Sequence, residues 1–319
     1  MDIVCSTDSK YIMPTGVMLT SLFENNKGET VHVHLLHDES TANLLEPIKL
    51  LAESYHQRID FYLINNKTFQ DFPIGLDYQL DHVGSSLATY YRLYLTEILP
   101  VDMDKVIYLD GDTLVVDKLV DLWKTDIHNY AIGAVPDSYN NKIEHYNRLR
   151  YPQALGYFNA GVLLINLKYW REHHVLAQFI DYVKSYPERL KCHDQDVLNY
   201  LFRNVKIGLP FRYNVLNEYW FDLRYSLVSW EYDQQILEAQ SHPAIIHFTC
   251  IPKPWYSNCK HPFKKEFDRY KRMSLWRTVS EKRWMPWKYC LEKMAIKLIV
   301  LIGLRKRDYI VENRYKTTI

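Results

Sequence analysis

The sequence predicts an α/β domain with an open sheet, because short apolar runs alternate with longer amphipathic segments along most of the chain. Hydrophobic residues fill 47% of the 319 positions, so the chain can bury a large core and is not mainly disordered. It shows no internal repeat and no low-complexity linker. We therefore expect one large domain, residues 1–270, followed by a tail, residues 271–319.

The elements follow one another in a regular order. Apolar spacing predicts strands at residues 3–5, 31–36 and 59–64, with helices at 15–23 and 42–55 between them. A helix at 86–98 then precedes strands at 106–109, 131–135 and 162–165, a helix begins near residue 168, and a last strand covers 245–248. Residues 211–240 indicate a loop-rich lid or one wall of a site, because they are irregular and rich in rings: Tyr213, Tyr219, Trp220, Phe221, Tyr225, Trp230 and Tyr232.

Charge divides the chain into an acidic body and a basic tail. Residues 271–319 hold 13 Lys and Arg against 4 Asp and Glu, so the tail carries +9 and the body carries −8. The tail also has an apolar run at 298–304, too short to span a bilayer, and four large rings: Trp276, Trp284, Trp287 and Tyr289. These features predict a basic, aromatic, amphipathic helical tail that contacts an anionic membrane surface. An ordinary amphipathic helix packed on the body is the alternative.

Cysteine usage and the chain start favour a cytoplasmic protein. The five cysteines are isolated, with no CxxC pair, and the first residues lack the basic and apolar regions of a signal peptide. The acidic body argues against a nucleic-acid partner. We expect a peripheral protein on the inner face of the cytoplasmic membrane.

The strongest chemical signal is an apolar strand that ends on Asp110, Gly111 and Asp112. Residues i and i+2 of an extended chain face the same way, so both carboxylates can reach one cation. Ligands of open α/β sheets collect at the carboxyl ends of strands, where a glycine lets a nucleotide approach the backbone. The alternative is an ordinary turn, since these residue types are common turn formers.

A second strand ends on a possible metal ligand, His247, and Lys253 follows closely. Two carboxylates, an imidazole and a nearby ammonium suit a metal diphosphate, and oxygen ligands with one imidazole favour Mn²⁺ or Mg²⁺ over a thiolate zinc site. The alternative for His247 is a core histidine held by hydrogen bonds.

Six sequence blocks in the same order resemble family 8 glycosyltransferases. They are Met-Asp-Ile-Val at the start, Thr-Tyr-Tyr-Arg-Leu at 89–93, Tyr-Leu-Asp-Gly-Asp at 108–112, Phe-Asn-Ala-Gly-Val-Leu-Leu-Ile-Asn-Leu at 158–167, Asp-Gln-Asp at 194–196, and His247 through Lys-Pro-Trp at 253–255. The resemblance covers about residues 1–270 and is strongest to bacterial lipooligosaccharide galactosyltransferases and lipopolysaccharide glucosyltransferases. It implies a retaining enzyme of the GT-A fold, with a Rossmann-like mixed central sheet flanked by helices.

The resemblance also implies a donor site for a UDP-hexose. Mn²⁺, or Mg²⁺, would be held by Asp110, Asp112 and His247. Asp8 and Tyr11 match uracil contacts, Lys253 a phosphate contact, and Arg92, Asn159 and Asp194 contacts to the donor sugar. The full set of expected donor-binding positions is Asp8, Lys10, Tyr11, Arg92, Asp110, Gly111, Asn159, Ala160, Asp194, Gln195, Cys250 and Lys253.

Some of these positions have plain structural alternatives or depart from the pattern. Arg92 can pair with a surface carboxylate, while Asp8 and Asn159 can be turn or cap residues. Lys10 replaces a smaller polar residue that meets the ribose, and Cys250 stands where a glycine approaches the phosphates. These two departures affect the nucleotide fit and leave the metal site intact.

The catalytic residues are expected in the stretch Asp194, Gln195 and Asp196. Double displacement needs a carboxylate beneath the anomeric carbon. Gln195 occupies the corresponding family position, and an amide is a poor nucleophile. We therefore favour front-face attack, in which the acceptor hydroxyl enters on the side that UDP leaves. Asp196 is the reserve nucleophile, with capping of a helix N-terminus as its structural alternative.

Two other groups resemble sites, and we expect both to be structural. His32, His34 and His37 resemble a metal cluster, but the first two simply alternate along a strand. Cys192 and His193 are adjacent, which a thiol nucleophile and its base rarely need to be.

The sequence thus predicts transfer of galactose or glucose from a UDP-sugar to a glycan, such as lipopolysaccharide or another lipid-linked oligosaccharide. A metal-dependent phosphohydrolase that uses Asp110, Asp112 and His247 is one alternative. A non-enzymatic protein that binds a sugar nucleotide or a glycan is another.

Overall fold

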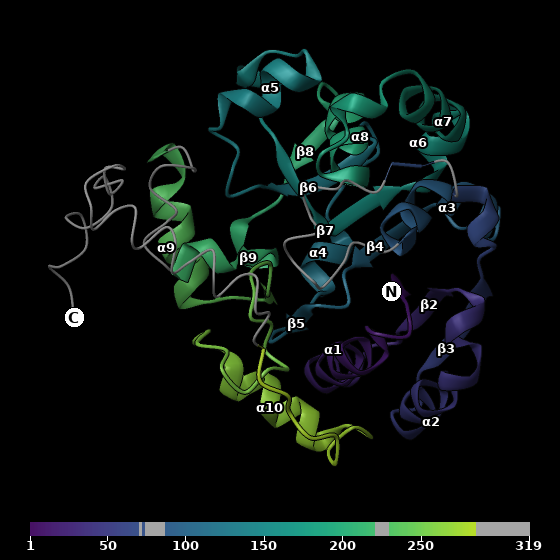
Figure 1. The fold of residues 1–319 in the computed structure, drawn as a ribbon, viewed down its shortest axis with the longest axis vertical. Helices are drawn as coiled ribbons and strands as arrows, with labels where there is room; N and C mark the ends of the chain where they lie inside the picture. The colour runs from purple at the N-terminus through teal and green to yellow at the C-terminus, as the bar shows by residue number, and fades with distance from the viewer. Residues whose placement is uncertain (70–71, 74–86, 221–229, 285–319) are drawn as a thin grey trace, which may run out of the picture.

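A mixed sheet forms the centre of the computed structural model, which describes residues 1–69, 72–73, 87–220 and 230–284. Within these residues the sheet has seven strands in the order β3-β2-β1-β4-β7-β6-β8 (Figure 1). They are β1 Asp2–Thr7, β2 His32–His37, β3 Arg58–Leu63, β4 Lys105–Leu109, β6 Ile132–Pro136, β7 Phe158–Asn166 and β8 Lys206–Gly208. Only β7 among them is antiparallel to its neighbours, β4 and β6. The predicted Rossmann-like mixed sheet is confirmed.

A second, three-stranded sheet has the order β5-β10-β9. Its strands are β5 Thr113–Val115, β10 Ile245–His247 and β9 Val215–Leu216. Because β5 begins directly after the Asp-Gly-Asp turn and β10 pairs with it antiparallel, this sheet extends the central one at the carboxyl end of β4.

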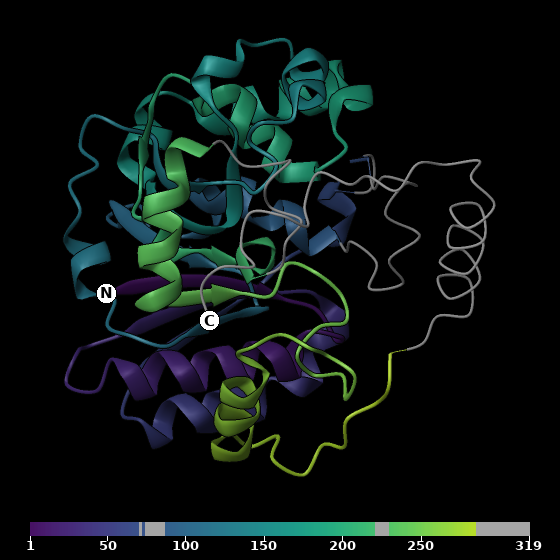
Figure 2. The same ribbon diagram turned by 90° about the vertical axis from the view of Figure 1, so that its left-hand side faces the viewer.

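Helices cover both faces of the central sheet, as Figure 2 shows from the side. Ile3 and Cys5 of β1 belong to the core beneath α1 Ile12–Asn25 and α2 Glu46–Ser54. Val4, between them, belongs to the core beneath α6 Leu167–Glu172, α7 Val175–Ser185 and α8 His193–Phe202. Successive strand residues point to opposite faces, so a buried strand supplies both cores.

The remaining described helices are short. They are α3 Leu95–Ile98, α4 Val120–Lys124, α5 Ile143–Leu149, α9 Asp233–Ser241 and α10 Lys264–Met273. The 3₁₀ turns are η1 Glu39–Leu44, η2 Asn66–Phe69, η4 Leu87–Tyr94, η5 Gln153–Leu155, η6 Pro187–Arg189, η7 Phe211–Tyr213, η8 Asn217–Trp220 and η10 Trp230–Tyr232.

Two predicted helices differ from the observed ones. The helix expected at 42–55 is divided into η1 and α2. Pro47 is the second residue of α2, a position that proline tolerates because the first N–H groups of a helix have no partner. The segment expected as a helix at 86–98 is the 3₁₀ turn η4 followed by α3. Its threonine and two adjacent tyrosines are weak formers of α-helix.

The aromatic section 211–240 is more regular than predicted. It contains η7, β9, η8 and η10, and α9 covers its end and buries Ile236 and Ala239. The polar composition of α9 hid this helix, because only two of its nine residues are buried. Phe221 and Tyr225 lie outside the described residues.

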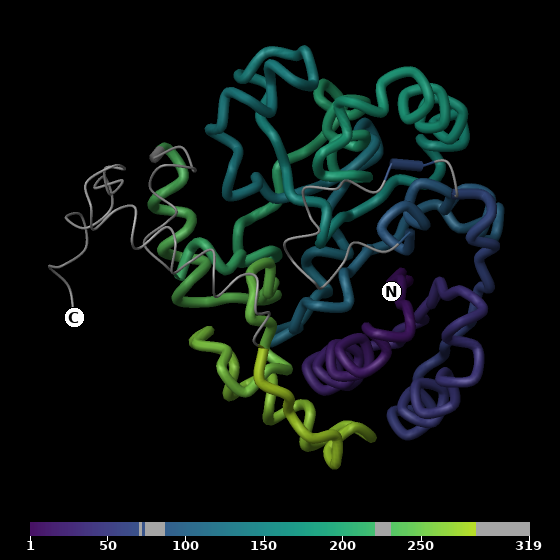
Figure 3. Tube along the Cα trace, viewed as in Figure 1, coloured from purple at the N-terminus to yellow at the C-terminus, as the bar shows by residue number. Residues whose placement is uncertain are grey.

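The first part of the predicted tail is integrated into the domain. Helix α10 crosses the predicted boundary at residue 270, and Figure 3 shows it beside α1. Asn25 Nδ2 of α1 donates a hydrogen bond of 2.8 Å to the Tyr270 hydroxyl of α10. Trp276 is only 9% exposed and packs on Gly16, where an added Cβ would lie 2.0 Å from its ring. Trp284 is also buried.

These two tryptophans therefore contact protein rather than lipid. Trp287, Tyr289 and the apolar run at 298–304 lie outside the described residues. None of the helices in the described part of the chain has the length and apolarity needed to cross a bilayer.

Candidate active site

Three potential metal ligands converge where the two sheets meet. Asp110 and Asp112 follow β4, and His247 ends β10, where it pairs with Thr113 just beyond the turn. One ligand atom from each of the three residues lies within 4.8 Å of the other two. His247 Nε2 is 3.3 Å from Asp112 Oδ1 and 4.0 Å from Asp110 Oδ2. The structure thus brings together the three residues that the sequence analysis assigned to the metal.

A chain of amide side chains orients His247. Its Nδ1 lies 3.0 Å from Asn214 Oδ1, and Asn214 Nδ2 donates to Asn159 Oδ1 over 2.9 Å. Because an amide oxygen only accepts, Nδ1 carries a proton, and this contact directs Nε2 at the carboxylates. Asn214 was missed in the sequence, where nothing distinguished it from other buried polar residues.

A glycine in β7 leaves room for this cluster. A Cβ added to Gly161 would lie 2.1 Å from His247 Cε1 and 2.9 Å from Asp110 Oδ2. Any larger residue would therefore displace two of the three ligands. The sequence signal was available, because glycine within a strand often marks close approach of another group.

Buried cations compensate the charge of the acids. Arg92 donates from Nη2 to Asp110 Oδ1 at 2.6 Å and from Nη1 to the Ala160 carbonyl at 2.5 Å, and its Nε lies 3.0 Å from Asp194 Oδ2. The guanidinium also stacks 4.1 Å above the Tyr108 ring. The surface ion pair considered as the alternative for Arg92 is excluded, because the side chain is buried.

Lys253 compensates the second acid. Its Nζ donates to Asp112 Oδ2 at 2.8 Å and to the carbonyls of Phe248 and Thr249. Burial would raise the pKa of Asp112, but Lys253 and His247 outweigh burial and lower it below its usual range. Burial raises the pKa of Asp110 despite the adjacent Arg92 guanidinium. With this geometry Lys253 compensates the charge of Asp112.

The donor set fits a divalent cation. Two carboxylates and one oriented imidazole are ligands that Mn²⁺ and Mg²⁺ accept, and no thiolate takes part among the described residues. The glycine at 161 lets the side chains of His247 and Asp110 approach the β7 backbone closely.

A cavity of about 980 Å³ opens beside the cluster, within the usual size range for small-molecule sites. Its lining includes eight of the predicted positions: Arg92, Asp110, Asn159, Ala160, Asp194, Gln195, His247 and Cys250. It also includes two acids that the sequence analysis missed, Asp137 and Glu218. Burial raises the pKa of Asp137, although Asn159 Nδ2 donates to it at 2.9 Å. Both acids lie outside recognisable blocks, so only the fold reveals them.

The residues at the start of α8 differ in their surroundings. Asp194 faces the cavity, where it contacts Arg92 and accepts a hydrogen bond from the Thr89 hydroxyl. Gln195 also lines the cavity, and its Oε1 accepts from the Ala160 N–H at 2.9 Å.

Asp196 is fully buried and is not part of the cavity lining. Arg148 donates to both of its oxygens at 2.6 and 2.9 Å, the Cys192 N–H donates at 2.6 Å, and the Tyr157 hydroxyl at 2.8 Å. Helix α8 begins at His193, so Asp196 lies within its first turn and is not the N-cap residue that the structural alternative expected, although its oxygens are occupied by these partners. These contacts favour a structural role for Asp196 over that of reserve nucleophile, because its side chain pairs with Arg148 and does not line the cavity.

Asp8, Lys10 and Tyr11, which were expected to contact the nucleotide, lie in the turn before α1 and are not part of the cavity lining. Asp8 Oδ1 accepts from the N–H groups of Lys10 and Tyr11 at 2.8 and 3.0 Å, which shapes the turn into α1. The Tyr11 ring meets Trp255 edge to face at 5.4 Å. A Cβ on Gly111 would lie 2.6 Å from Thr15 Oγ1, so this turn and α1 are closely packed.

Cys250 lines the cavity, and its Sγ donates to Glu218 Oε1 at 3.2 Å. Burial, with the nearby Glu218, raises the pKa of this thiol to about 12. The thiol is therefore neutral at physiological pH. The neighbouring Glu218 carboxylate is one of the two acids in the cavity that the sequence did not indicate.

Another group of potential ligands, His145, Cys192 and Asp196, already contacts the Arg148 guanidinium. Arg148 Nη2 lies 3.1 Å from His145 Nδ1 and donates to Asp196 as described. A metal ion there would have to displace the guanidinium.

Comparisons with known proteins agree with this geometry. Residues 2–259 match the family described as Glycosyl transferase family 8. A putative glycosyltransferase of Haemophilus influenzae is 30% identical over 268 residues, which cover 82% of this chain and 74% of that protein. A lipopolysaccharide 1,2-glucosyltransferase of Escherichia coli K12 is 26% identical, and the match covers 88% of this chain and 80% of that protein.

A solved structure shares the whole architecture. The galactosyltransferase LgtC, in complex with donor and acceptor sugar analogues, superimposes with a TM-score of 0.76 at 26% identity, covering 92% of this chain and 100% of that chain. The chain therefore belongs to glycosyl transferase family 8 and has its GT-A fold.

Proposed function

We propose that this chain is a retaining hexosyltransferase that moves galactose or glucose from a UDP-sugar to a hydroxyl of a glycan acceptor. One observation supports this above all. The ligand atoms of Asp110, Asp112 and His247 converge at the edge of a cavity of about 980 Å³ in a glycosyl transferase family 8 fold. The names of relatives, a lipopolysaccharide 1,2-glucosyltransferase and a galactosyltransferase, favour these two sugars and a lipid-anchored glycan.

The metal group would hold Mn²⁺ or Mg²⁺, which as a Lewis acid stabilises the negative charge of a departing diphosphate. The protein supplies the orientation. Asn214 holds the His247 ring, while Arg92 and Lys253 hold the two carboxylates. Such prearranged ligands need no reorganisation when a substrate arrives. Arg92 also fixes Asp194 in the cavity wall, where that carboxylate can accept hydroxyl groups of the donor sugar.

Retention by front-face attack is the mechanism that the contacts favour. Asp194 is paired with Arg92, and Asp137 accepts hydrogen bonds from Asn159 and from the Tyr139 N–H, so neither is a free nucleophile. The Gln195 amide oxygen is held by the Ala160 N–H. We infer that the acceptor hydroxyl attacks on the side that UDP leaves, and that its proton passes to a phosphate oxygen of UDP.

A donor screen tests the function. Release of UDP is measured for UDP-galactose, UDP-glucose and other UDP-sugars, with Mn²⁺ or Mg²⁺, in the presence and absence of lipopolysaccharide-type acceptors. We expect release from one of the two hexose donors to require an acceptor, and nuclear magnetic resonance of the product to show the donor's anomeric configuration. An inverted product would contradict retention.

Two other outcomes would favour the alternatives. Equal release of free sugar with and without acceptor indicates a phosphohydrolase. Tight binding of UDP-sugars without turnover on any acceptor indicates a binding protein. Membership of glycosyl transferase family 8 argues against both.

We also propose that the tail brings the enzyme to its acceptor at an anionic membrane. The sequence from 285 to 319 alone carries 8 Lys and Arg against 3 Asp and Glu, and each basic residue near such a surface contributes about 1 kcal/mol. Cosedimentation with vesicles that contain phosphatidylglycerol should exceed that with neutral vesicles and should decline in high salt. Equal recovery with both vesicle types would contradict the proposal.

A further inference from the structure

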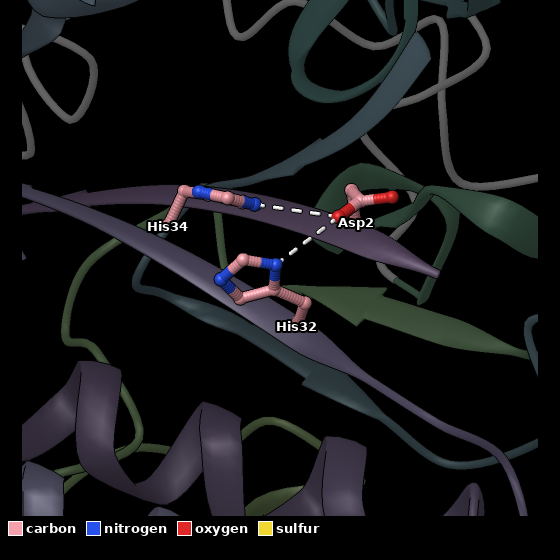
Figure 4. Close-up of side chains that lie close together, drawn as sticks. All are labelled: Asp2, His32 and His34. Carbon is pink, nitrogen blue, oxygen red and sulfur yellow. Dashed lines mark hydrogen bonds and ion pairs between the residues drawn. The ribbon is translucent and has the colours of Figure 1, made fainter. Parts of the chain in front are cut away.

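A second group of potential metal ligands lies at the opposite end of the parallel strands. Asp2 begins β1 and pairs in register with His32 of β2, so the two side chains leave the same face of the sheet. His34, two residues further along β2, leaves that face as well. Figure 4 shows both imidazoles directed at the Asp2 carboxylate. The sequence analysis took the alternating histidines as structural, because the neighbouring strand that supplies Asp2 cannot be seen in their spacing.

Each histidine is oriented by a further side chain from β3. His32 Nε2 lies 2.8 Å from Asp60 Oδ2, and His34 Nδ1 lies 3.0 Å from the Tyr62 hydroxyl. Arg58 holds the same Asp60 oxygen at 2.7 Å. Metal-binding histidines almost always donate their second ring nitrogen to such a partner, which fixes the tautomer and the ring orientation.

The tautomer of His32 leaves a vacant acceptor that faces an anion. A carboxylate only accepts, so Nε2 must carry the proton that binds Asp60. Nδ1 of the neutral ring then presents its lone pair to Asp2 Oδ1 at 3.5 Å. When the ring is neutral, these two electron-rich atoms face each other at a distance that a cation between them can bridge.

The separations match those of a tetrahedral metal site. Asp2 Oδ1 lies 3.5 Å from His32 Nδ1 and 3.4 Å from His34 Nε2. Good N–H···O hydrogen bonds are shorter, about 2.7–3.2 Å. With metal–ligand bonds of about 2.0–2.1 Å, the ligands of tetrahedral Zn²⁺ lie about 3.3–3.4 Å apart. The third pair, between the two imidazole nitrogens, is within 4.8 Å, so a small rotation closes the triangle.

We propose that Asp2, His32 and His34 form a zinc site, with Asp2 Oδ1, His32 Nδ1 and His34 Nε2 as ligands and a water in the fourth position. The side chains of Asp2 and His32 are 30% and 19% exposed, while His34 is 0% exposed, so solvent reaches the site from one side. Two imidazoles favour zinc over the harder Mg²⁺. The ion would join β1 to β2 and stabilise the sheet at the amino ends of these strands, away from the cavity. It is independent of the proposed transferase reaction.

Zinc binding to the Asp112→Asn variant tests the proposal, because this background removes the Asp110–Asp112–His247 group. The protein is stripped with a chelator, and Zn²⁺ is added while its thermal unfolding is followed. We expect one zinc per chain, and an unfolding midpoint raised by about 5 °C when free zinc is a hundredfold above its dissociation constant. Co²⁺ in its place should give the strong visible absorption of a tetrahedral site.

Matched variants separate this site from other ligands on the surface. His32→Gln in the same background should lose the bound zinc, the midpoint shift and the Co²⁺ absorption. His37→Gln should keep all three, since His37 ends the same strand and its Nδ1 contacts the Asp38 carbonyl instead. Asp2→Asn, at a partly exposed position, is the second test if His32→Gln folds poorly. Zinc binding that survives both His32→Gln and Asp2→Asn, or no zinc on the parent, would overturn the proposal.

Discussion

The two groups of histidine and carboxylate ligands use similar chemistry at opposite ends of the central sheet. Asp110, Asp112 and His247 lie beyond the carboxyl end of β4, whereas Asp2 and His32 lie at the amino ends of β1 and β2. In both groups the ring nitrogens are oriented by neighbouring polar side chains. Ligand type alone therefore does not decide which group takes part in catalysis.

Space and charge balance distinguish them. The first group borders a cavity of about 980 Å³, and Gly161 lets His247 and Asp110 approach the β7 backbone. Two buried cations, Arg92 and Lys253, compensate the charge of its acids. No residue of the second group lines that cavity. In an open α/β sheet, loops at the carboxyl ends of strands separate and leave a crevice for ligands. A metal at the amino ends, outside that cavity, would join β1 to β2.

Removal of the Asp112 carboxylate should cause the largest loss of activity. It should also distinguish the Asp110–Asp112–His247 group from the Asp2–His32–His34 group. Asp112→Asn should lower metal-dependent UDP release about a thousandfold, because Lewis-acid stabilisation is worth several kcal/mol. The zinc-dependent rise in unfolding midpoint should be unchanged. Asp117→Asn is the control, since Asp117 is exposed and pairs with Arg212. Full activity of Asp112→Asn would refute the metal site.

A methyl group added at Gly161, beside His247 and Asp110, should cause the next largest loss of activity. Gly161→Ala places a Cβ 2.1 Å from His247 Cε1 and 2.9 Å from Asp110 Oδ2. We expect UDP release to fall about a hundredfold, as displacement of catalytic groups by about 1 Å does. Gly208→Ala in the same sheet is the matched control, because its Cβ would meet nothing within 4 Å. Similar rates for the two variants would show that the space does not matter.

A substitution in the His145–Cys192–Asp196 group should change the stability of the protein rather than its activity. Asp196→Asn leaves the Arg148 guanidinium without its charged partner, and breaking a buried ion pair costs about 3–5 kcal/mol. Urea unfolding should report this loss, whereas Asp181→Asn, exposed on α7, should not change stability. If Asp196→Asn keeps its stability but loses activity as completely as Asp112→Asn, Asp196 is catalytic after all.

A small dependence on pH should come from a histidine outside both ligand groups. Burial lowers the pKa of His261 to about 4, so this ring is neutral when folded and takes up a proton on unfolding below its ordinary pKa. The unfolded state binds more protons in that range, so stability falls as the pH decreases from about 6.5 to 4, by about 1 kcal/mol at pH 5.5.

His261→Asn should flatten that part of the stability profile, since an amide oxygen can still accept from the Phe263 N–H, as Nδ1 does. An unchanged profile would show that His261 does not contribute.

Several features followed from the sequence because their signals are local. Alternating apolar runs predicted the strands of the central sheet, and the i, i+2 spacing of Asp110 and Asp112 predicted that both face one cation. His247 was found because an apolar strand ends on it. Local signals failed where propensity was weak, as in η4, or where few residues are buried, as in α9.

The tertiary structure decided everything that depends on partners far apart in the chain. Asp194 and Asp196 are two residues apart, yet packing places the first in the cavity and the second on Arg148, 48 residues away. Trp276 belongs to the core because Gly16 leaves space for its ring. Asp2 meets His32 only through the register of β1 and β2. Sequence spacing fixes which way a side chain leaves its own strand or helix, but only the packing of elements determines what it meets.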